Sequence, residues 1–173
     1  MTSVATIGYE GASLEDFLAV LAFAGVTTLI DVREAPISRR KGFSKNILRE
    51  ALENIGIDYI HLVGLGNPKN GRDAAREGRL DDYIKIFSAQ MTTSKFKADL
   101  ERAAEIASEG GACLMCYERD PNGCHRKIVS EALYDIIDAN ISHLGVRKGI
   151  SKNGGEVRSR TRFNAGESAA PCG

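Results

Sequence analysis

Apolar residues along the chain follow two patterns, short continuous runs and longer segments in which they recur every three or four positions. The short runs predict β-strands at residues 4–7, 27–32, 57–62, 112–116 and 141–144. The periodic segments predict helices at residues 14–24, 45–55, 80–90, 94–108 and 124–137. This order predicts an α/β fold: a single-domain three-layer sandwich with a mostly parallel sheet of about five strands and helices on both faces.

Composition divides the chain into one domain and a tail. The 173 residues are 43% hydrophobic and 27% charged, which suits one compact domain, and we assign it residues 1–146. Residues 147–173 contain six basic residues against two acidic ones and few apolar residues, which predicts a disordered basic C-terminal tail. The formal net charge of the whole chain is zero, so overall charge does not favour a nucleic-acid partner. The sequence gives no indication of oligomeric state.

The distribution of apolar and cysteine residues bears on the cellular compartment. No apolar run approaches the ~20 residues of a membrane helix, and the N-terminus lacks the basic and apolar regions of a signal peptide. We therefore expect a cytoplasmic protein without a membrane partner. The four cysteines are then expected to be free, catalytic or metal-bound rather than joined in structural disulfides.

The most informative segment is residues 111–137, in which an apolar strand, a tight polar loop and an amphipathic helix follow one another. Cys124, His125 and Arg126 fall in the first turn of this helix. The N–H groups of a first turn lack partners inside the helix, and the helix dipole is positive there, so anions and thiolates are favoured. Cys124 is therefore expected to ionise readily.

Polar and reactive residues follow the predicted strands at one end of the sheet. They are Tyr9, Glu10, Asp31, Arg33, His61, Cys116 and Glu118. In open parallel sheets, ligands bind beyond the carboxyl ends of the strands. We therefore expect a binding or catalytic site at this edge.

Two of the predicted loops have unusual compositions. Residues 34–43 are basic and include Ser38, Arg39, Arg40 and Lys41, so this loop is either a solvated connection or a flap over an anionic ligand. Residues 64–71 are rich in glycine but lack the spacing of phosphate-binding or dinucleotide-binding motifs, and we predict a mobile loop.

Several of these residues together resemble a known family pattern, over roughly residues 4–144. The residues that carry the resemblance are Gly8, Asp31-Val32-Arg33, Pro36, Ser38, Phe43, Tyr59, Leu65-Gly66, Cys116, Glu118 and Cys124-His125-Arg126. This pattern is similar to that of the family catalogued as domain of unknown function 488 (DUF488). The resemblance implies an α/β fold and identifies these positions as the shared pattern, but it implies no substrate.

The first functional hypothesis is an enzyme, a cysteine-dependent hydrolase, transferase or redox enzyme, that acts on a small anionic substrate bearing phosphate or carboxylate. Its candidate catalytic residues are Cys124, Cys116, Glu118, Asp31 and His125. Its candidate substrate-binding residues are Arg126, Arg33, Tyr9, Ser38, Arg39 and His61. Cys124 would be the nucleophile or would cycle with Cys116 through a disulfide.

Two other functional hypotheses remain open. In one, Cys116, Cys124 and His125 hold zinc or iron, with His61 or Asp31 as a further ligand. In the other, a non-catalytic module binds nucleotide or nucleic acid. Its contacts would be Arg33, Arg39, Arg40, Lys41 and the basic tail.

A structural interpretation is the last alternative. In it the cysteines are packed as small hydrophobic residues, and Asp31 and Arg33 form a buried ion pair. Cys113 belongs to the core in every case, because residues three apart on a strand point to opposite faces, away from Cys116.

Overall fold

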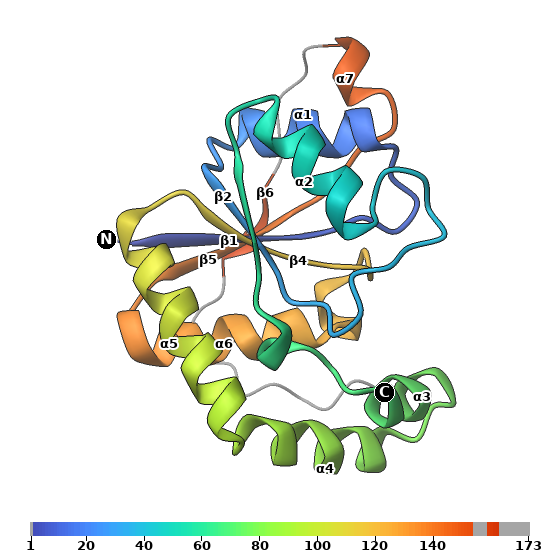
Figure 1. The fold of residues 1–173 in the computed structure, drawn as a ribbon, viewed down its shortest axis with the longest axis vertical. Helices are drawn as coiled ribbons and strands as arrows, with labels where there is room; N and C mark the ends of the chain where they lie inside the picture. The colour runs from blue at the N-terminus through green and yellow to red at the C-terminus, as the bar shows by residue number, and fades with distance from the viewer. Residues whose placement is uncertain (1, 154–158, 163–173) are drawn as a thin grey trace.

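Five parallel strands form the centre of the fold. In the computed structural model, which describes residues 2–153 and 159–162, the strand order is β3-β2-β4-β1-β5-β6 (Figure 1). The parallel strands are β1 (Ser3–Gly8), β2 (Thr28–Asp31), β3 (Asp58–His61), β4 (Ala112–Cys116) and β5 (Asn140–Leu144). A further strand, β6 (Ser159–Arg162), pairs antiparallel with β5 at the edge. The predicted α/β fold with a mostly parallel sheet is confirmed.

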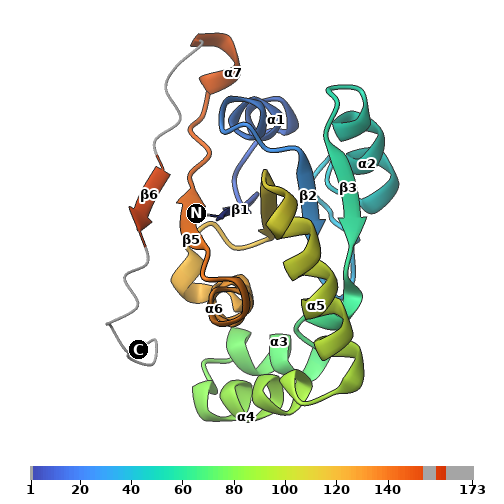
Figure 2. The same cartoon turned by 90° about the vertical axis from the view of Figure 1, so that its left-hand side faces the viewer.

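Helices cover both faces of the sheet and complete a three-layer sandwich (Figures 1 and 2). One face is covered by α1 (Leu14–Phe23), α2 (Lys45–Glu53) and α7 (Ile150–Asn153). The other face is covered by α5 (Ser94–Glu109) and α6 (His125–Ile137), with α3 (Lys69–Arg76) and α4 (Leu80–Met91) beyond them. Throughout the described residues, no helix has both the length and the apolar character needed to cross a membrane.

Strand β4 lies between β1 and β2 and is buried along its whole length. Its side chains alternate between two hydrophobic cores. Leu114 and Cys116 pack in the core under α5 and α6, whereas Cys113 and Met115 pack in the core under α1 and α2. Cys113 and Cys116 therefore lie on opposite faces of the sheet, as the strand period requires.

Local signals account for the boundaries of the helices. The hydroxyl oxygen of Ser13 accepts a hydrogen bond from the backbone N–H of Asp16 at 3.1 Å and so caps the start of α1. Thr93 caps α5 in the same way, through the N–H of Phe96. Gly25, with φ of 69°, supplies the left-handed residue that ends α1.

The prediction of a mobile loop at residues 64–71 is wrong. The segment contains a short 3₁₀ helix, Val63–Leu65, and the first turn of α3, which begins after Pro68. The sequence of α3 is mostly polar, so it offers no apolar periodicity to recognise. Gly71 lies inside α3, where a Cβ would collide with the side chain of Asn67. A glycine at this position therefore allows close packing and does not indicate flexibility.

Within the segment expected to be a disordered tail, residues 147–153 contact the domain through Ile150, Gly149 and Ser151. Ile150 is buried against the α1 side of the sheet. The carboxylate of Asp16 accepts hydrogen bonds from the backbone N–H groups of Gly149 at 2.8 Å and Ser151 at 3.0 Å, and from the Ser151 hydroxyl at 2.7 Å. Apart from β6, the rest of the expected tail lies outside the described residues.

Candidate functional site

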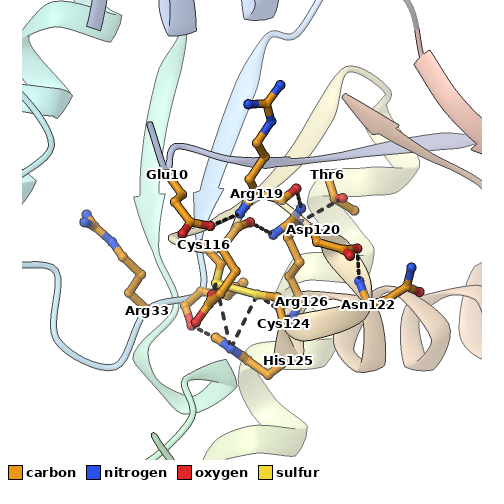
Figure 3. Close-up of a disulfide and its surroundings, with 12 residues drawn as sticks. Thr6, Glu10, Arg33, Cys116, Arg119, Asp120, Asn122, Cys124, His125 and Arg126 are labelled. Atoms are coloured by element: carbon orange, nitrogen blue, oxygen red, sulfur yellow. Dashed lines mark hydrogen bonds between the residues drawn. A yellow bond between two sulfur atoms is a disulfide. The ribbon is translucent and has the colours of Figure 1, made fainter. Parts of the chain in front are cut away.

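The site is built on the connection from β4 to α6. Cys116 is the last residue of β4, a 3₁₀ turn at Pro121–Gly123 reverses the chain, and Cys124 is the N-cap residue of α6 (Figure 3). Their Sγ atoms form a disulfide at 2.50 Å, with the Cα atoms 7.4 Å apart. The sequence-based expectation that the two cysteines lie within reach of each other is confirmed.

Arg126 holds the connecting loop in place. Its guanidinium is fully buried and donates hydrogen bonds to the carbonyl oxygens of Glu118 and Arg119 and to the hydroxyl of Thr6 (Figure 3). Gly8 is needed at the end of β1, because a Cβ there would collide with the backbone of Glu118. Arg126 does not line the cleft, and each of its guanidinium nitrogens donates to a protein oxygen, so its predicted substrate-binding role stays a prediction.

His125 lies beside the two sulfurs as a neutral imidazole in a single tautomer. Its Nε2 lies 2.9 Å from the carbonyl oxygen of Val32, and since a carbonyl only accepts, Nε2 carries the proton. Burial lowers the pKa of His125 to about 4, so the ring is neutral at physiological pH. Its Nδ1 lone pair then faces the sulfurs of Cys116 and Cys124, each 3.9 Å away.

Glu118 places a carboxyl group beside Cys116. One carboxyl oxygen lies 2.7 Å from the Cys116 Sγ. Burial raises the pKa of Glu118, so a larger share of this carboxyl is protonated near neutral pH than for an exposed glutamate. A carboxyl group with a raised pKa that contacts a sulfur can take a proton from a thiol or return one to a thiolate.

Asp31 and Arg33 form a buried ion pair behind the site. The Arg33 guanidinium contacts the Asp31 carboxylate at 2.7 Å and also donates to the Tyr9 hydroxyl at 3.0 Å and the Phe43 carbonyl at 2.8 Å. Tyr59 donates its hydroxyl to Asp31 at 2.6 Å. Asp31 is fully buried and does not line the cleft, which fits the structural interpretation, and its catalytic role stays a prediction.

A cleft of about 970 Å³ opens at the carboxyl ends of the strands. Cys116, Glu118 and His125 contribute to its wall, but Cys124 does not. The other residues that line it are Tyr9, Arg33, Glu34, Ala35, Ile37, Ser38, Arg39, Arg40, Asn67, Arg72, Ala75, Arg76, Tyr83, Tyr117 and Gly123. Of the two cysteines, only Cys116 lines the cleft, and both residues are buried.

The cations of the cleft differ in how far they are neutralised. Arg33 is paired with Asp31, and Arg72 is paired with Glu34. Arg39 is exposed, and Arg40 is exposed with its Nε–H donating to the carbonyl of Ala12, so neither has a carboxylate partner among the described residues. The loop of residues 34–43 therefore contributes excess positive charge to the cleft.

The structure separates the other predicted residues into two groups. Tyr9 and Ser38 line the cleft, and the Ser38 hydroxyl oxygen accepts the backbone N–H of Arg40 at 3.1 Å. Lys41 does not line it, and neither does His61, whose Nε2 lies 2.7 Å from the Arg33 carbonyl oxygen. Nucleic-acid binding through residues 39–41 and the tail stays a prediction.

Sequence reasoning missed the wall formed by α3 and α4. Arg72 and Arg76 of α3 and Tyr83 of α4 belong to it, and Asn67 lines the cleft just before α3. The Oδ1 atom of Asn67 is buried without a hydrogen-bond partner among the described residues. The one available signal was the spacing of Arg72 and Arg76, four residues apart and so on one face of a helix.

One comparison with known proteins identifies the family of the chain. The model of the family described as "Domain of unknown function DUF488" matches residues 13–133, which include the carboxyl end of β4, both cysteines of the site and most of α6. No curated protein and no solved structure matches the chain. Since the family match spans well over half of the chain, the protein belongs to the DUF488 family.

Proposed function

We propose that the protein is a thiol–disulfide oxidoreductase that acts on a small anionic thiol bound in the cleft. The observation that carries this proposal is the asymmetry of the cysteine pair. Cys116 lines the cleft, and Cys124, joined to it, lies behind the cleft at the N-cap of α6. Cys116 is thus the cysteine beside which a bound substrate would lie, and Cys124 is the one positioned to leave.

The first step is attack by the substrate thiolate on the Cys116 sulfur. A bond forms between the substrate sulfur and Cys116, the Cys116–Cys124 bond breaks, and Cys124 leaves as a thiolate. The backbone N–H of Arg126 donates to the Cys124 Sγ at 3.4 Å. This donor and the dipole of α6 stabilise the leaving thiolate.

The second step releases the product. A second substrate thiolate attacks the substrate sulfur of the mixed disulfide, a substrate disulfide forms, and Cys116 leaves as a thiolate. Two electrons have then passed from two thiols to the protein, and the reverse sequence passes them to another disulfide. Glu118 accepts the proton of the first incoming thiol and returns it to Cys116, whereas the proton of the second goes to solvent.

The charge of the cleft supports an anionic substrate. Arg39 and Arg40 have no carboxylate partner among the described residues and lie on the loop that borders the cleft. Because Cys116 and Cys124 are almost fully buried from solvent, the substrate has to be a small molecule or to carry its thiol at the end of a narrow chain. A low-molecular-weight thiol with carboxylate or phosphate groups has both properties.

The proposal is tested by stopped-flow reduction of the oxidised protein with matched small thiols, in the presence of a metal chelator. Mercaptopropionate and its neutral amide are suitable probes, compared at equal thiolate concentration. The carboxylate is expected to react about tenfold faster at low salt, and the difference is expected to shrink in high salt or in Arg39→Ala/Arg40→Ala. Equal rates, or a difference that survives the double substitution, would contradict the assigned substrate charge.

A further inference from the structure

The three donor atoms of Cys116, Cys124 and His125 form a cluster with properties that disulfide exchange does not use. Their ligand atoms all lie within 4.8 Å of one another, and all three residues are buried. Thiol–disulfide exchange needs the two sulfurs but has no step for the Nδ1 atom of His125. The imidazole is nevertheless held with that atom facing both sulfurs.

The tautomer of His125 is the one that a metal ligand requires. Its Nε2–H is committed to the Val32 carbonyl at 2.9 Å, which leaves Nδ1 with an unshared pair. Histidines that bind metals commonly donate their second ring N–H to a backbone carbonyl in this way, which fixes the orientation of the ring. The hydrogen bond therefore presents Nδ1 toward the sulfurs without any rearrangement.

The distances between the three ligand atoms fit a tetrahedral metal ion once the two sulfurs move apart. With Zn–S near 2.3 Å and Zn–N near 2.0 Å, tetrahedral ligands lie about 3.6 Å apart for nitrogen and sulfur and about 3.8 Å apart for two sulfurs. Nδ1 already lies 3.9 Å from each Sγ, so only the two sulfurs have to separate. The Cα atoms, 7.4 Å apart, exceed the ~4.4–6.8 Å usual for a disulfide, so side-chain rotation alone gives the sulfurs room.

Charge and access define the kind of site. Two thiolates neutralise a divalent ion, so the filled cluster carries no net charge in a buried setting. The three residues supply three ligands, and Cys116 and His125 both line the cleft. The fourth position of the ion therefore faces the cleft, as in catalytic rather than structural zinc sites, where water or a substrate thiolate completes the coordination.

From these observations we infer that the reduced protein binds one thiophilic divalent metal ion, of the class of Zn²⁺, through Cys116, Cys124 and His125. The disulfide and the metal complex exclude each other, because the metal requires both sulfurs as thiolates. The inference uses the sulfurs of the proposed oxidoreductase but does not depend on that activity. Oxidation of the pair releases the ion, and reduction restores the site.

Competition with a chromophoric zinc chelator tests the inference on tag-free protein. Reduced wild type is expected to take up one Zn²⁺ per chain, and oxidised wild type none. Cys116→Ser, Cys124→Ser and His125→Gln are each expected to lose at least about tenfold in affinity. Two matched control variants should keep the zinc affinity of wild type. Cys113→Ser is one, because that thiol faces the other hydrophobic core. His61→Gln is the other, because its ring also contacts a backbone carbonyl but lies outside the cluster.

A spectroscopic measurement on wild type alone covers the case in which a variant fails to fold. Co²⁺ added to the reduced protein is expected to give a sulfur-to-cobalt charge-transfer band with the intensity of two thiolates, which oxidation abolishes. Absence of metal uptake by reduced wild type, or uptake unchanged in Cys124→Ser and His125→Gln, would overturn the inference. Since the exchange rates above are measured with chelator present, the two proposals fail independently.

Discussion

Cys116 lines the cleft, whereas Cys124, to which it is bonded, does not, although their Sγ atoms are 2.50 Å apart. The difference follows from the elements that hold them, since one residue ends a strand and the other begins a helix. The two thiols of the reduced protein are therefore chemically unequal. In the proposed reaction Cys116 meets the substrate, and Cys124 leaves as a thiolate.

Cys124 is expected to ionise at a lower pH than an ordinary thiol once the disulfide is absent. The variant Cys116→Ser/Cys172→Ser leaves Cys124 and Cys113 as the remaining cysteines, and burial raises the pKa of Cys113. Thiolate absorbance at neutral pH then reports Cys124. We expect half-ionisation at least about one pH unit below the ~8.5 of a free thiol. Ionisation only above that value would show that the start of α6 does not activate it.

Replacing Gly8 should disturb the site through the backbone. In Gly8→Ala, the new methyl group meets the carbonyl of Glu118 at the end of β1, so the loop that Arg126 holds must shift. We expect a loss of about 1–3 kcal/mol in unfolding free energy and slower disulfide exchange. Gly145→Ala is the matched control, since a Cβ there has open space and the residue does not line the cleft. Equal effects of the two substitutions would contradict this role of Gly8.

Asp31 should matter for stability rather than for proton transfer. Asp31→Ala leaves the buried Arg33 guanidinium without its counter-charge, and we expect a cost of about 3–5 kcal/mol in denaturant unfolding. Tyr59→Phe removes one hydrogen bond to the same carboxylate and should cost less, about 1.5–3 kcal/mol. If Asp31→Ala folds with wild-type stability but no longer exchanges disulfides, the result would support the catalytic role predicted from the sequence.

Asp16 should make the attachment of residues 147–153 dependent on pH. Hydrogen bonds from Ser151 and Gly149 hold the pKa of Asp16 well below its ordinary value of 3.8. Because the unfolded chain takes up the proton first as pH falls, the stabilisation is complete above about pH 4–5 and decreases at lower pH.

Melting temperatures of wild type and Asp16→Asn between pH 7 and pH 3 test this dependence. The variant should melt lower at pH 7, and the gap should narrow as the pH falls below about 4. Asp81→Asn, at an exposed position in α4, should follow wild type throughout. A gap for Asp16→Asn that stays constant with pH would show that the carboxylate charge does not hold this segment.

Sequence reasoning was most successful where the local pattern carries the signal. The apolar run of β4 and the turn residues before Cys124 are contiguous, so the strand, the turn and the helix start could be predicted together with the proximity of the two cysteines. α3 was missed because its residues are polar and its glycine is explained only by contact with Asn67.

The roles of the buried arginines depended on distant partners. Arg126 donates to Thr6, 120 positions earlier in the chain, and Arg33 donates to Tyr9 and the Phe43 carbonyl. Nothing in the neighbouring residues distinguishes such an arginine from one that faces a ligand. The same limitation applies to residues 147–153, whose attachment depends on Asp16 in α1.

Trapping the mixed disulfide tests the central claim most directly. Reduced Cys124→Ser and reduced Cys116→Ser are each incubated with a small anionic disulfide, with Cys172→Ser in both backgrounds, and adducts are located by peptide mass mapping. Cys124→Ser is expected to hold a stable adduct on Cys116, because the second sulfur that would release it is absent. Cys116→Ser is expected to form little adduct on Cys124, which does not line the cleft. An adduct on neither cysteine, or an equally fast one on Cys124, would contradict the proposal that Cys116 is the sulfur that exchanges with the substrate.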